Sequence, residues 1–125
     1  MPTMPVSAIT RKEYRILVIE DDVIQVQILK DVLSMTFAVE AVGTAKDGLE
    51  RLKRPPLVDV AILDLKLPNG EGIDLVTWFL SSSPEVPVIV LTGYDYPQEK
   101  VIETGAQDFL QKPVTIEALI TSMAK

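Results

Sequence analysis

Four apolar segments of this 125-residue chain lead into polar side chains that can bind and transfer charged groups. In chain order these polar residues are Glu20, Asp21 and Asp22, then Asp64, Thr92 and Lys112. If the four segments are parallel strands, their carboxyl ends lie along one edge of a sheet, and the six side chains converge there. Carboxylates held close together repel one another unless a cation lies between them. The sequence therefore predicts an acidic, cation-dependent site.

The residue types at this site select the chemistry. The chain contains no histidine and no cysteine, so an all-oxygen site would prefer a hard ion such as Mg²⁺ or Mn²⁺. A lysine and a threonine hydroxyl on the far side can neutralise and hydrogen-bond phosphate oxygens. Asp64 ends an apolar run and precedes a turn that contains Pro68. A carboxylate in that place is a competent phosphoryl acceptor, and we interpret Asp64 as the nucleophile.

Composition excludes several other classes. The absence of histidine and cysteine removes disulfides, thiolate and histidine-assisted nucleophiles, zinc sites of the usual kind, and a phosphohistidine on this chain itself. The net charge is −6, and the densest basic cluster, at residues 51–54, is too small to indicate nucleic-acid binding. Uncharged runs are shorter than the roughly 20 residues that span a bilayer, and no signal-peptide pattern is present. A cytoplasmic protein without membrane contact is expected.

Hydrophobic periodicity predicts five alternating strand and helix units. Strands are expected at 14–19, 38–42, 58–64, 86–91 and 108–111, and helices from about 23 to 35, 44 to 53, 73 to 80, 97 to 104 and from 115 onward. Strands that read as continuous apolar runs are buried on both faces, which favours a doubly wound α/β fold with a five-stranded parallel sheet. In the first helix we expect Ile28 and Val32 to widen the inward-facing stripe, and we interpret Trp78 as a packing residue.

Four short segments, taken together, carry a resemblance to a known family. They are Val18-Ile19-Glu20-Asp21-Asp22, Leu63-Asp64-Leu65-Lys66-Leu67-Pro68, Val90-Leu91-Thr92-Gly93 and Phe109-Leu110-Gln111-Lys112-Pro113. In this order and at these spacings they resemble the response-regulator receiver domain, the CheY-like family of two-component signalling. The resemblance implies a flavodoxin-like (βα)5 fold with strand order 2-1-3-4-5. We expect residues 1–14 to form a flexible lead and residues 15–125 to form the receiver domain.

The resemblance also implies roles for the site residues. Asp64 would accept a phosphoryl group from the phosphohistidine of a sensor histidine kinase or a phosphotransfer protein, with Thr92 and Lys112 holding the phosphoryl oxygens. Glu20, Asp21, Asp64 and the backbone carbonyl of Lys66 would hold Mg²⁺, with Mn²⁺ as a substitute.

The implied output runs through the last helix, strand and helix of the fold. Phosphorylation would draw Thr92 inward and let Phe109 swing into the vacated space. The switched surface, about residues 97–124, would face a downstream output domain or protein, and the resemblance also allows a homodimer there. The interval from Thr92 to Gly105 is about two residues shorter than usual, so the helix at 97–104 should be short or irregular.

Two bulky residues near the site depart from the simplest pattern. Lys66 and Tyr94 each lie two positions beyond a site residue, where they flank the path of an attacking water. We hypothesise that they tune the phosphorylated state by slowing its hydrolysis. Phe109 stands where many family members have tyrosine, which removes a hydroxyl from the output surface.

Each candidate residue also has a purely structural interpretation. Asp64 could cap a turn, and Glu20 with Asp21 could be a solvated helix start, although Asp22 is the better-placed cap. Thr92 could simply end a strand, Lys112 could be solvated in an extended dipeptide before Pro113, and Phe109 could be ordinary core. The convergence of these residues favours the functional interpretation.

Three other functions remain as alternatives. The first is a receiver-like interaction module that is never phosphorylated, but degenerate receivers usually lose residues such as Asp64 or Lys112. The second is a phosphohydrolase, which would need a carboxylate where this chain has Lys66. The third is a flavodoxin-like electron carrier, whose phosphate would be repelled by residues 20–22. We therefore expect a signalling switch that catalyses only its own phosphoryl transfer and dephosphorylation.

Overall fold

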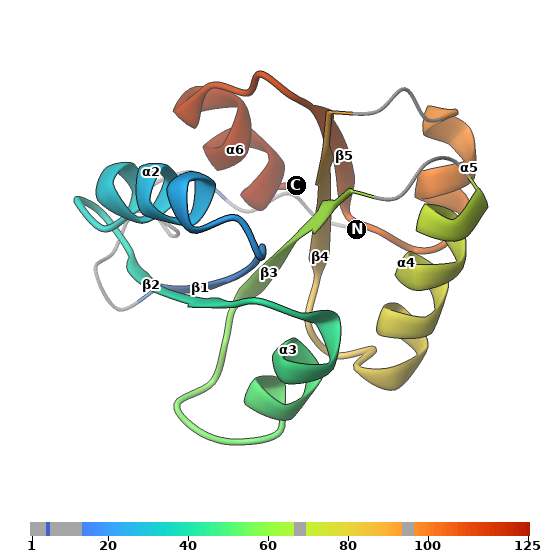
Figure 1. The fold of residues 1–125 in the computed structure, drawn as a ribbon, viewed down its shortest axis with the longest axis horizontal. Helices are drawn as coiled ribbons and strands as arrows, with labels where there is room; N and C mark the ends of the chain where they lie inside the picture. The colour runs from blue at the N-terminus through green and yellow to red at the C-terminus, as the bar shows by residue number, and fades with distance from the viewer. Residues whose placement is uncertain (1–4, 6–13, 67–69, 94–96) are drawn as a thin grey trace.

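The computed structural model describes residue 5 and residues 14–66, 70–93 and 97–125, and it shows alternating strands and helices. In chain order the elements are β1 (Arg15–Ile19), α2 (Val23–Leu33), β2 (Ala38–Val42), α3 (Ala45–Leu52), β3 (Val60–Leu65), α4 (Gly70–Ser82), β4 (Val88–Thr92), α5 (Gln98–Glu103), β5 (Asp108–Gln111) and α6 (Ile116–Met123). All neighbouring strands are parallel, and their order is β2-β1-β3-β4-β5 (Figure 1). The predicted fold class and strand order are confirmed.

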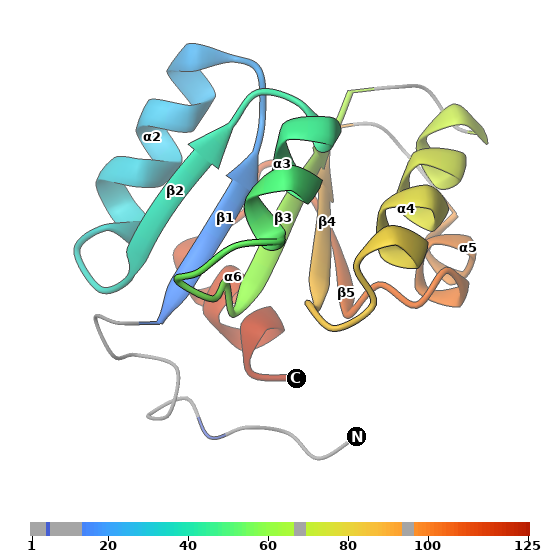
Figure 2. The same cartoon turned by 90° about the horizontal axis from the view of Figure 1, so that it is seen from below.

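Helices cover both faces of the sheet (Figure 2). One apolar cluster joins the sheet to α3, α4 and α5, and it includes Leu49, Phe79 and Val101. The other joins the opposite face to α2 and α6 through Leu33 and Leu119. Strands β3 and β4 are buried along their whole length, which explains why they read as unbroken apolar runs.

The helix starts and one helix end follow the local chemistry of the sequence. Asp22 caps α2, where its carboxylate accepts hydrogen bonds from the amides of Ile24 and Gln25. Thr44 and Thr115 cap α3 and α6 in the same way. After α5, Gly105 adopts a φ of 101°, which a residue without a Cβ reaches without strain.

Three sequence-based expectations about side chains and bounds need correction. Ile28 and Val32 do not widen the buried stripe of α2, because they are 59% and 39% exposed. The helix lies over β1 and β2 at the margin of the sheet, so only a narrow stripe that ends in the buried Leu33 faces the core. Trp78 is 46% exposed on α4, so it is only partly a packing residue. Helix α4 is also longer than predicted, whereas α5 is as short as expected.

The N-terminal region is described only in part. Residues 1–4 and 6–13 of the expected flexible lead lie outside the described residues. Tyr14 packs its ring on Phe37, with ring centroids 5.8 Å apart, and its carbonyl accepts a hydrogen bond from the amide of Ala38. None of the helices among the described residues is long and apolar enough to cross a membrane.

Candidate functional site

The register of the sheet brings the predicted site residues to one edge. Ile19 lies beside Leu63, so the residues that follow them, Glu20 and Asp64, are neighbours across β1 and β3. On the other side of β3, Thr92 pairs with Leu65, the residue after Asp64. The amide of Lys112 donates a hydrogen bond to the carbonyl of Thr92, which fixes the end of β5 beside β4. The carboxyl ends of four strands therefore meet, as predicted.

Lys112 forms the closest charged contact with Asp64. Its Nζ lies 2.6 Å from Asp64 Oδ2 and 3.6 Å from Glu20 Oε1. The same ammonium group also donates to the side-chain oxygen of Gln25 on α2. The sequence analysis did not predict a role for Gln25. Its position, one helical turn after the Asp22 cap, could have indicated that this polar side chain lies near the site.

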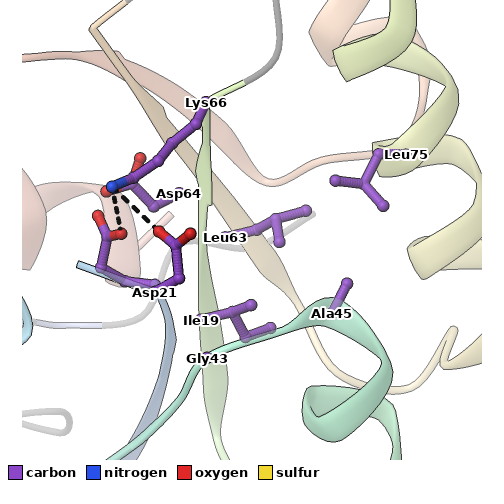
Figure 3. A pocket seen from close by; sticks show the side chains of 9 residues that line it. Ile19, Asp21, Gly43, Ala45, Leu63, Asp64, Lys66 and Leu75 are labelled. Carbon is purple, nitrogen blue, oxygen red and sulfur yellow. Dashed lines mark ion pairs between the residues drawn. The ribbon is translucent and has the colours of Figure 1, made fainter. Parts of the chain in front are cut away.

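Lys66 reaches back from the end of β3 to the acidic residues after β1. Its Nζ lies 2.8 Å from Glu20 Oε2, 3.1 Å from Asp21 Oδ1 and 4.0 Å from Asp22 Oδ2. Figure 3 shows the Lys66 side chain pointing towards Asp21, to which a dashed line joins its ammonium group. The sequence predicted that Lys66 would stand near the site, but not that its ammonium group would pair with these carboxylates.

Burial and charge together set the pKa values of the central carboxyl groups. Burial, with Glu20 close by, raises the pKa of Asp64 from 3.8 to about 7, against the opposing effect of Lys112. Burial would also raise the pKa of Glu20, but Asp64, the Lys66 ammonium and the Asp22 amide outweigh it and lower that pKa to about 2. Burial and the neighbouring Glu20 carboxyl therefore favour the neutral form of Asp64.

The site offers oxygen atoms that are suited to a hard cation. Glu20 Oε1 and Asp64 Oδ1 are buried and accept no hydrogen bond within the described ranges, whereas Asp64 Oδ2 is buried against the Lys112 ammonium. Buried polar atoms without a partner are costly, so they indicate a group that completes the site. Among the described residues, no three acidic side chains are already arranged so that they could hold one metal ion. The Lys66 ammonium lies between the carboxylates of Glu20 and Asp21. The donor chemistry nevertheless fits Mg²⁺ or Mn²⁺.

A small pocket opens beside these carboxylates. It has a volume of about 160 Å³. One wall is charged and consists of Glu20, Asp21, Asp64 and Lys66, and the opposite wall is apolar. The pocket therefore leaves space of about the size of a phosphoryl group beside Asp64.

The other predicted residues occupy different positions relative to Asp64. Thr92 is fully buried, and its hydroxyl donates to the carbonyl of Leu65 over 2.9 Å. Phe109 is half-buried on β5 against the cluster that contains Phe79. Tyr94 lies outside the described residues, so the expectation for it stays untested.

Comparison with known proteins decides the family. The family model described as the response regulator receiver domain matches residues 16–124 of this chain. The chain belongs to the response regulator receiver domain family. This receiver match covers the whole sheet and all five helices apart from the first residue of β1.

Individual relatives agree with the family assignment. The response regulator MprA of Mycobacterium sp. (strain KMS) is 34% identical over 116 residues, which cover 87% of this chain and 48% of MprA. The receiver domain of a putative LuxO repressor protein from Vibrio parahaemolyticus is 30% identical with a TM-score of 0.74, covering 90% and 88% of the two chains. The BeF3-activated DrrB receiver domain is 27% identical with a TM-score of 0.68, covering 86% and 92%. This receiver chain spans about half the length of MprA.

Proposed function

We propose that Asp64 is the phosphoacceptor of this receiver domain in a two-component or phosphorelay system. The observation that carries the proposal is the buried Asp64 carboxylate, whose Oδ2 lies 2.6 Å from the Lys112 ammonium and whose Oδ1 accepts no hydrogen bond from the described residues. Asp64 thus has a free nucleophilic oxygen and a positive charge beside it. That combination suits transfer of a phosphoryl group to a carboxylate.

The proposed donor is a phosphohistidine on a sensor histidine kinase or phosphotransfer protein. An Asp64 oxygen attacks the phosphorus and the bond between phosphorus and the donor imidazole breaks. The imidazole, already protonated on its other ring nitrogen in the phosphohistidine, leaves as the neutral ring. Lys112 balances the charge that the phosphoryl oxygens bring, and Thr92 turns its hydroxyl from the Leu65 carbonyl towards them. These steps need little covalent help, because positioning and charge neutralisation dominate phosphoryl transfer.

The proposed cation is Mg²⁺, for which Mn²⁺ can substitute. Glu20, Asp21, Asp64 and the backbone carbonyl of Lys66 would hold it. When bound, the ion neutralises carboxylate and phosphoryl charge, which favours the ionised form of Asp64.

The surface beside the pocket suits a protein donor. The first turn of α2 starts at the Asp22 cap and places Val23 and Ile24 in solvent, and Ile28 follows one turn later. This exposed apolar surface adjoins Gln25, which contacts Lys112. We propose that a helix of the phosphodonor protein packs on these three residues, because burial of apolar area stabilises such contacts.

The proposed output passes through α5, β5 and α6. Phe109 on β5 packs against the core cluster that also contains Val101 of α5. Movement of Phe109 after phosphorylation would change this surface for a downstream output domain or protein. Lys66 would also shield the acyl phosphate from water. We propose no catalytic activity beyond the domain's own phosphoryl transfer and dephosphorylation.

Phosphoryl uptake from a small-molecule donor tests the assignment of Asp64. The wild type, Asp64→Asn and the control Asp59→Asn are incubated with acetyl phosphate and Mg²⁺, and their intact masses are measured. We expect the wild type and the Asp59 variant to gain one phosphoryl group, and the Asp64 variant to gain none. Equal uptake by the Asp64 variant, or no uptake by the wild type, would refute the proposal.

A further inference from the structure

The Lys66 ammonium group occupies the acidic side of the site. It pairs with Glu20 at 2.8 Å and with Asp21 at 3.1 Å, the two carboxylates assigned above to the divalent ion. The side chain of Glu20 is fully buried, whereas that of Lys66, the residue that follows β3, is 38% exposed. Lys66 can therefore swing into solvent, while Glu20 must keep a positive partner in place.

We propose that Lys66 is a built-in counter-ion that competes with the divalent cation for Glu20 and Asp21, so that metal binding displaces its ammonium group. The inference rests on the proposed function for the identity of the cation site. Two positive charges cannot share the same carboxylate oxygens without strong repulsion, because they would lie only a few ångströms apart. Lys66 is tethered, so it is always present at high effective concentration, and the ion must overcome it.

The two lysines of the site have different contacts, and this separates their roles. Lys112 lies against Asp64 and Gln25 and is 3.6 Å from Glu20. Within the described ranges no ion pair joins Lys112 to Asp21, whereas Lys66 reaches both Glu20 and Asp21. Lys112 is therefore placed for the phosphoryl group, and Lys66 is placed where the ion must bind.

Competition makes the metal affinity of this domain low, and the effect is reciprocal. If Lys66 lowers the affinity for the cation by a certain factor, the bound cation weakens the contact of Lys66 with Glu20 by the same factor. Free Lys66 is then available beside the pocket, next to Asp64. Metal binding therefore also repositions the residue that we expect to control access of water.

A metal titration without any phosphodonor tests the competition. Mn²⁺ binding is followed by the electron paramagnetic resonance signal of the free ion for the wild type, Lys66→Met and Lys53→Met. Lys53 is an exposed lysine at the end of α3 that pairs only with Glu50 among the described residues, so its variant matches the change in net charge. We expect Lys66→Met to bind Mn²⁺ at least tenfold more tightly than Lys53→Met, which corresponds to about 1.4 kcal/mol. Affinities within twofold, weaker binding by Lys66→Met, or no binding by any variant would overturn the inference.

Displacement itself is visible in the wild type by nuclear magnetic resonance. With lysine ε-carbons labelled, saturating Mg²⁺ should shift and sharpen the Lys66 signal and leave the Lys53 signal unchanged. An unchanged Lys66 signal would overturn the inference. The proposed function is tested separately by phosphoryl uptake at Asp64, so uptake without a difference in metal affinity would refute only the role of Lys66.

Discussion

The Asp64→Asn variant should be more stable than the wild type, and by an amount that grows with pH. Asp64 is a buried carboxyl beside Glu20, and its pKa is raised from 3.8 to about 7. The folded chain therefore holds this proton more tightly than the unfolded chain does. The free energy of unfolding falls as the pH rises from the pKa of Asp64 in the unfolded chain to its pKa of about 7 in the folded chain. Above this pH the fall is complete. Asparagine keeps the shape and removes the titration.

The size of the gain follows from the same shift. Each tenfold change in proton affinity corresponds to about 1.4 kcal/mol, so ionised Asp64 costs the wild type at most about 4 kcal/mol. Part of this is offset, because Asp64 contributes to the lowered pKa of Glu20. We expect the free energy of unfolding to rise by about 2–3 kcal/mol at pH 8, and by clearly less at pH 5.

Urea denaturation in EDTA measures this difference directly. The wild type and Asp64→Asn are compared between pH 5 and pH 8 by circular dichroism, with Asp74→Asn on the exposed side of α4 as a control that should change little. Added Mg²⁺ should stabilise the wild type more than the Asp64 variant, because the ion neutralises the same charge. A gain that is independent of pH, or an Asp64 variant that is less stable than the wild type at pH 8, would refute the electrostatic reasoning.

Three further substitutions test the buried arginine, the turn after α5 and the exposed apolar surface of α2. Arg51→Met should lower the free energy of unfolding by about 3 kcal/mol, because buried Arg51 bonds Glu40 and the carbonyls of Arg54 and Pro56; a urea midpoint close to that of the wild type would contradict this. Gly105→Ala should cost about 1 kcal/mol, because alanine is strained at a φ of 101°; unchanged stability in the same assay would show that the turn relaxes freely. Ile28→Glu places a charge on the exposed apolar surface of α2, so it should slow phosphoryl transfer from the cognate protein donor at least tenfold. Transfer from acetyl phosphate, followed by intact mass like the other reaction, should stay unchanged. Equal slowing with both donors would exclude a docking role for α2.

Much of the fold was predictable because local and global signals agree. Strands β2 and β5 lie at the predicted bounds, and β3 and β4 differ by one or two residues at their ends. The apolar runs, the caps at Asp22 and Thr44 and the turn at Gly105 each specify one element. Helix α4 starts at residue 70 and not at the predicted residue 73. The glycines at 70 and 72 are poor helix formers, so their low helix propensity favoured a turn at these positions.

The site residues were predictable as a set, but their pairings were not. Glu20, Asp64 and Lys112 each lie at the carboxyl end of a strand, and in a parallel sheet these ends meet at one edge. The observed pairing of Ile19 with Leu63 is the register that brings Glu20 next to Asp64. The reach of Lys66 depends on the rotamers of a long, flexible side chain, which the sequence does not encode locally. The exposure of Ile28 depends on where α2 lies over the sheet, so periodicity alone assigned it to the wrong side.

Chemical trapping of the phosphorylated residue tests most directly whether Asp64 is the phosphoacceptor. After incubation with acetyl phosphate and Mg²⁺, borohydride reduces an aspartyl phosphate to homoserine, and the tryptic peptide of residues 54–66 is sequenced by mass spectrometry. This peptide contains both Asp59 and Asp64, so its fragments distinguish the two positions. We expect homoserine at position 64 and aspartate at position 59. Homoserine at position 59 or outside this peptide, with residue 64 unmodified, would contradict it.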